Sequence, residues 1–77
     1  MPGKAYRQGV DGQIDWLDTS MRDAYEVARD AARAEFGWQR VKWARGKGEN
    51  DRGIERGEGA WDYVTNAGIT YHWSYPP

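Results

Sequence analysis

Apolar residues recur at three- and four-residue spacing through one segment of the chain, residues 20–36. This spacing places them on one face of an α-helix and puts charged side chains on the other face. Five alanines favour the helix, and their small size would let a sheet approach closely. Three residues are candidate N-caps: Asp18, Thr19 and Ser20, the last forming a capping-box pattern with Asp23. The pattern predicts one amphipathic helix over residues 20–36, stopped by Gly37.

Alternation of period two marks three segments after this helix, residues 38–45, 60–65 and 69–75. Such alternation is typical of strands with one face buried. One helix followed by three strands predicts an α+β fold, in which the amphipathic helix packs on a three-stranded antiparallel sheet.

The last two predicted strands are separated by Asn66-Ala67-Gly68, which suits a three-residue hairpin loop with Gly68 at positive φ. If Thr65 and Ile69 flank that loop, opposite residues follow in pairs, with Trp61 facing Trp73 and Tyr63 facing Tyr71. One face would then carry Trp61, Tyr63, Thr65, Ile69, Tyr71 and Trp73. We expect the helix to cover this face, because it is the richest apolar surface that the pattern provides.

The length of 77 residues predicts a single small domain, 1–77, with a thin core. Residues 1–12 have little periodicity and read as an N-terminal arm. Residues 13–18 fit either a short strand or a helical turn. Residues 46–59 hold five glycines and seven charged residues, which predicts a mobile loop.

Composition excludes several classes of site. The chain has no cysteine and one histidine, so a Cys/His zinc site is excluded and no cofactor is expected. The apolar runs are too short for a transmembrane helix, and the N-terminal residues lack the apolar stretch of a secretory signal. We therefore expect a cytoplasmic protein that does not bind membranes.

The formal net charge is −1, but basic residues gather in residues 38–47. Tryptophans interleave with them there, and the charged loop follows. Aromatic and basic side chains in one segment favour contact with a protein or with phosphates. The predicted partner-binding residues are Trp38, Arg40, Lys42, Arg45, Lys47, Glu49, Asp51 and Arg52.

Candidate catalytic chemistry reduces to one pair, Asp62 opposite His72. A carboxylate can orient an imidazole for acid–base work. The nearest hydroxyls, Thr70 and Ser74, lie two residues away along the same strand face, about 7 Å by strand geometry. That distance is too long for a nucleophile–base pair. The pair is therefore interpreted as a half-exposed cross-strand contact, and no enzyme is expected.

Richness in Trp, Tyr and Arg is typical of protein interfaces. The sequence predicts a non-enzymatic protein–protein interaction module that binds a larger protein or complex. Small cysteine-free α+β chains without a catalytic motif look like phage-encoded inhibitors of host machinery, including defence complexes. The alternative is a nucleic-acid-binding accessory protein that uses strand 38–47. Exposed tryptophans could equally form a homo-oligomer.

Overall fold

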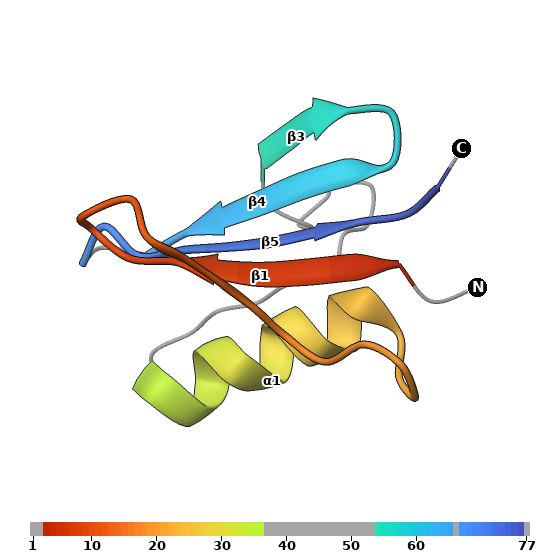
Figure 1. Cartoon of the computed structure of the whole chain (residues 1–77). Helices are drawn as coiled ribbons and strands as arrows, with labels where there is room; N and C mark the ends of the chain where they lie inside the picture. The colour runs from red at the N-terminus through yellow and green to blue at the C-terminus, as the bar shows by residue number, and fades with distance from the viewer. Residues whose placement is uncertain (1–2, 37–53, 66, 77) are drawn as a thin grey trace.

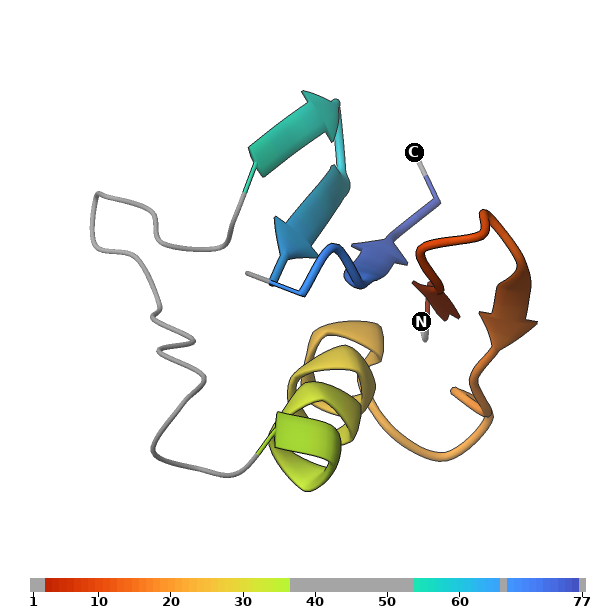
Figure 2. The ribbon, with the colours of Figure 1, turned by 90° about the vertical axis from the view of Figure 1, so that its left-hand side faces the viewer.

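The computed structural model describes residues 3–36, 54–65 and 67–76. The elements in chain order are β1 (Lys4–Gln8), β2 (Ile14–Trp16), α1 (Ala24–Phe36), β3 (Ile54–Gly57), β4 (Ala60–Val64) and β5 (Thr70–Ser74). The strands form one antiparallel sheet in the order β2-β1-β5-β4-β3. The helix α1 lies across one face of this sheet (Figure 1; Figure 2).

The predicted α+β class is confirmed, but the prediction of three strands undercounts a sheet of five. Strand β1 lies within the predicted arm, residues 1–12, and it occupies an inner position between β2 and β5. Strand β3 lies within the predicted loop 46–59. The predicted strand 38–45 lies outside the described residues. The undercount has a physical reason: the strand β1 buries only the small side chain of Ala5, which gives little apolar signal.

The predicted C-terminal hairpin is confirmed in its register. Trp61 pairs with Trp73, and Tyr63 pairs with Tyr71. Gly68 has φ of 82°, and its N–H donates to the Thr65 carbonyl at 3.0 Å. This is the positive-φ position that a three-residue loop requires.

The hairpin of β1 and β2 uses the same kind of turn. Gly12 has φ of 88°, and its N–H donates to the Gly9 carbonyl at 2.9 Å. Gly9 in turn donates to the Gln13 carbonyl at 3.0 Å, and Asp11 Oδ1 accepts the Gln13 N–H. A side chain that binds the backbone two residues on holds the turn, which fixes how β2 lies beside β1.

The core lies between α1 and the inner strands. Three helix alanines are fully buried: Ala24, Ala28 and Ala32. They pack against a sheet face on which Trp73 and Tyr71 are the largest fully buried side chains. The predicted aromatic face is therefore the face that the helix covers, with Trp61 and Tyr63 partly buried at its margin.

The helix begins at Ala24 rather than at residue 20, which corrects the predicted start. The Asp18 carboxylate accepts both the N–H and the hydroxyl of Ser20, and this local turn competes with helix. At the true start, the hydroxyl of Tyr75 accepts the Tyr25 N–H at 3.1 Å and donates to Asp23. A side chain from the far end of the chain thus satisfies a free N–H of the first helical turn.

A network of hydrogen bonds and an ion pair joins the C-terminal end of the helix to the sheet. Arg7 on β1 donates two hydrogen bonds of 2.8 Å to the Glu35 carboxylate, and the Tyr71 hydroxyl donates to the same carboxylate. Burial, followed by the bond to Glu35, raises the pKa of Tyr71 to about 12. The hydrogen bonds from Arg7 and Tyr71 lower the pKa of Glu35. The neutral phenol and the ionised carboxylate are therefore the forms that stabilise the fold.

Stability should fall at alkaline pH because Tyr71 must ionise. A phenol whose pKa is about 12 when folded and about 10 when unfolded stabilises the fold fully below pH 10, and its contribution is lost as the pH rises toward 12. Urea unfolding of the parent and of Tyr71→Phe should show the stability difference shrinking between pH 10 and pH 12. A constant difference across that range would contradict this assignment.

The helix-free face as the candidate functional site

The eight predicted partner-binding residues all lie in 37–53, outside the described residues. The described part of the chain presents a different candidate surface, the sheet face turned away from α1, called here the helix-free face. It is read from the strand alternation: Ala5 points into the core, so Tyr6 points away from the helix. Its central residues are Tyr6, Trp16, Arg56, Asp62 and His72.

Three rings stand side by side across three neighbouring strands. Tyr6 on β1 is in register with Trp16 on β2 and with His72 on β5. The Tyr6 and His72 rings stack with centroids 4.5 Å apart and planes 16° apart. Trp16 meets Tyr6 edge to face, with centroids 5.1 Å apart. Each ring therefore limits the movement of its neighbour, and the row is preformed.

The row continues into a charged end on β4 and β3. Asp62 Oδ1 lies 2.6 Å from His72 Nδ1, and Asp62 Oδ2 accepts a 2.9 Å hydrogen bond from Arg56 Nε. The expected cross-strand pair of Asp62 and His72 is thus present. It is more buried than expected, with side chains 14% and 16% exposed, because Tyr6 covers the imidazole. Partial burial, followed by the Asp62 charge, raises the pKa of Tyr6.

The contacts of Asp62 and His72 hold both side chains in place on the surface. Both Asp62 oxygens are engaged, and one face of the His72 ring is covered by Tyr6. Within residues 3–36, 54–65 and 67–76, no three His, Asp or Glu side chains gather as a metal site.

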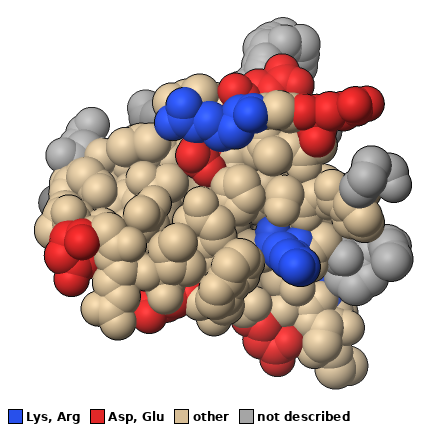
Figure 3. Space-filling view, turned by 45° about the horizontal axis from the view of Figure 1, so that its top comes forward, with Lys and Arg blue, Asp and Glu red and all other residues tan. Residues whose placement is uncertain are grey.

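The side chains around the row of rings include exposed apolar residues, which no other described residue buries. Trp16 is 63% exposed, although it is a large apolar residue on a strand. Ile14, Ile54 and Val64 are also exposed, at 40–48%. The pairings of Ile14 with Gln8 and of Ile54 with Asp62 place both isoleucines on the helix-free face. Figure 3 shows a broad uncharged area on this side of the molecule, with charged side chains around it.

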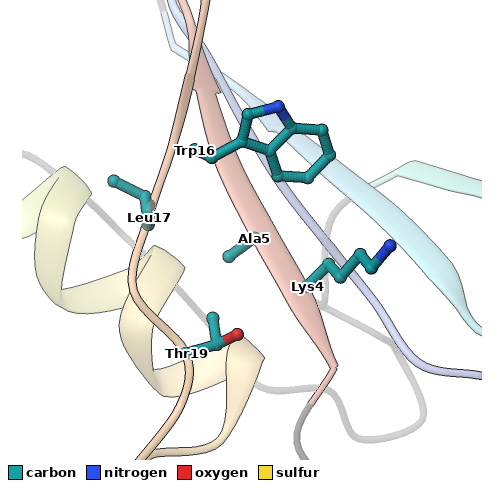
Figure 4. A pocket seen from close by; sticks show the side chains of 5 residues that line it. All are labelled: Lys4, Ala5, Trp16, Leu17 and Thr19. Carbon is teal, nitrogen blue, oxygen red and sulfur yellow. The ribbon is translucent and has the colours of Figure 1, made fainter.

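A pocket of about 320 Å³ lies beside Trp16, where the chain leaves β2. It is lined by Lys4, Ala5, Trp16, Leu17 and Thr19 (Figure 4). The Leu17 N–H donates to the Ala5 carbonyl, and the Thr19 hydroxyl donates to the Gly3 carbonyl at 2.7 Å. These bonds hold the pocket walls together, so the indole has a recess next to it that a partner side chain can enter.

The sequence contains one local signal for this face, in the loop before β2. Val10-Asp11-Gly12 is a three-residue segment ending in glycine, like the predicted hairpin loop Asn66-Ala67-Gly68. Treating both loops alike pairs residues 6–8 with residues 14–16 and places Tyr6 opposite Trp16.

No helix among the described residues is both long enough and apolar enough to cross a membrane. Comparisons of the chain with protein-family models, with curated proteins and with solved structures found no match.

Proposed function

We propose that this chain is a non-enzymatic binding module that captures a partner protein through its helix-free face. The observation that carries the proposal is the preformed row of Trp16, Tyr6 and His72, with Trp16 63% exposed at its end. Exposed apolar patches with a polar rim mark protein interaction sites. Tryptophan and tyrosine are also the residues that most often dominate binding energy. A phage-type inhibitor acts by covering a surface of a larger protein. This action needs an exposed binding face and no catalytic group.

The ring geometry favours a protein over a nucleic acid as the partner. A stacked base needs a free ring face, and such platforms sit in a positively charged groove. Tyr6 is stacked on His72 and also makes a T-shaped contact with Trp16. The Asp62 carboxylate lies in the same row. The segment 38–47, on which the nucleic-acid alternative rests, lies outside the described residues, so a low-salt oligonucleotide titration is the direct test of that alternative.

Photo-crosslinking can test the proposed face. A benzoylphenylalanine at position 16 or 64 should capture a protein from lysate of the cells in which the chain acts. The same group at position 21 is the control, because Met21 is 88% exposed but precedes α1 and lies outside the sheet. Adducts from positions 16 and 64 alone support the proposal. Equal adducts from all three positions, or adducts from position 21 alone, would refute it.

Truncating Trp16 should weaken capture of that partner strongly. A central aromatic anchor contributes about 2 kcal/mol or more, so Trp16→Ala should raise the Kd about thirtyfold. The fold should survive, since the lost ring contact with Tyr6 contributes only about 0.5–1.5 kcal/mol. Calorimetric titration of the captured partner gives the Kd, and Met21→Ala should leave it unchanged. Binding by Trp16→Ala at parental affinity would place the site elsewhere.

A further inference from the structure

Strand β2 ends the sheet, and its outward backbone groups face no other described strand. Antiparallel ladders alternate between residues that bond to the neighbour and residues that point away. The Gly9 N–H donates to Gln13, and the Leu17 N–H donates to Ala5, so residues 13, 15 and 17 are the ones that bond toward β1. The N–H and C=O groups of Ile14 and Trp16 therefore point outward from the edge of the sheet.

The two edges of the sheet differ in their protection. Strand β3, at the other edge, has a register irregularity between Glu55 and Gly57, and Arg56 within it is tied to Asp62. Such bulges and charged residues protect an edge from pairing with another strand. Strand β2 pairs regularly with β1 without a bulge, and its one charged residue is Asp15. Its edge is the more open to an added strand.

The side chains of β2 define what such a strand must carry. Ile14 and Trp16 lie on the helix-free face, so an added strand would place apolar residues there. Asp15 points to the other face and is 60% exposed. Its nearest cation is Arg7 at 4.0 Å, and Arg7 is held more closely by Glu35 at 2.8 Å. The Asp15 carboxylate is therefore available to a second cation.

We propose that the β2 edge accepts an extended segment of the partner protein as a sixth, antiparallel strand. Alternate residues of that segment are apolar and extend the helix-free face. The residues between them are lysine or arginine, and one of them faces Asp15. Backbone bonds to an exposed edge give affinity in this mode, and the alternating side chains give selectivity. The inference rests on the proposed function and names the mode and chemistry of its partner.

A pair of methylated peptides tests the mode directly. The probe is a blocked peptide, Val-Lys-Val-Lys-Val, added to the full chain and followed by backbone-amide NMR. In the proposed register the valines lie opposite Ile14 and Trp16, and their N–H groups face β2. Methylating the valine amides should abolish binding, whereas methylating the lysine amides should preserve it. Exchange of the Ile14 and Trp16 amide protons should slow only when the peptide binds.

Two variants test the same register from the side of the protein. Ile14→Pro removes an outward N–H and leaves the bonds to β1 intact, so binding should weaken about two- to tenfold while circular dichroism stays unchanged. Asp15→Lys should weaken binding about two- to fivefold, the range of an exposed ion pair. The Asp15→Lys variant should bind the peptide Val-Glu-Val-Glu-Val with the original affinity, because a lysine of the protein then faces a glutamate of the peptide.

The outcomes separate this inference from the proposed function. If both methylated peptides bind equally, the side chains dock without backbone pairing, and strand addition is wrong although the face still binds. If no peptide binds while position 16 still captures the partner, the chemistry assigned to the partner is wrong and the proposed function stands. If position 16 also captures nothing, both fail.

Discussion

Replacing Trp73 by alanine is expected to leave the chain largely unfolded at room temperature. Trp73 is 1% exposed and packs against Tyr25 and Trp61 between the helix and the sheet. Truncating a buried tryptophan costs about 3–5 kcal/mol. A single core of this size seldom supplies more than about 3–5 kcal/mol in total. The loss therefore removes most of the stability of the domain, which near-ultraviolet circular dichroism and amide dispersion in NMR would show.

The matched control is Trp16→Ala, which makes the same chemical change on the helix-free face. Because Trp16 is 63% exposed, this variant should keep the dispersed spectrum of the parent. A folded Trp73→Ala with a cooperative urea transition near the parental midpoint would show that the core does not depend on this indole.

Enlarging Ala28 to leucine is expected to destabilise the fold by about 1–3 kcal/mol, because it forces extra volume into a packed interface. Ala28 is fully buried in the alanine stripe of α1. That stripe allows the helix to lie close to β1 and β5, so a longer side chain must push the two layers apart. The free energy of unfolding from urea titration measures the effect.

Ala34→Leu serves as the control for overpacking. Ala34 lies on the same helix, and its side chain is exposed. Leucine and alanine have similar helix propensities, so this change should alter stability only slightly. Equal stabilities for the two leucine variants would mean that the helix–sheet spacing adapts without cost.

The helix and the C-terminal hairpin could be predicted because their side-chain patterns are strong and local. The helix face of Ala24, Ala28 and Ala32 follows from spacing alone, and Gly68 fixes the hairpin loop. The start of the helix was wrong by four residues, since the turn at Asp18 and the Tyr75 hydroxyl decide it. The second of these is a contact between segments 50 residues apart in the sequence, which local pattern does not contain.

Local pattern reaches only part of the candidate site. The pairing of Tyr6 with Trp16 follows from the short loop that folds β2 back on β1. Tyr6 and His72 meet because β1 inserts beside β5, a pairing across most of the chain. Pairing between distant strands depends on the whole sheet. The strand β1 also carries one buried apolar side chain, so its own pattern gave little indication of its inner position.

The pairing of β1 with β5 also has a consequence for how the polypeptide reaches its native state. Lys4 lies opposite Ser74, so β1 cannot complete its pairing with β5 until residue 74 has left the ribosome. Until then the N-terminal hairpin has no inner neighbour, and its tryptophan is open to other nascent chains. Topologies dominated by such distant contacts fold slowly and are exposed to aggregation meanwhile. Synthesis at lower temperature or with a holdase chaperone should therefore raise the yield of folded protein.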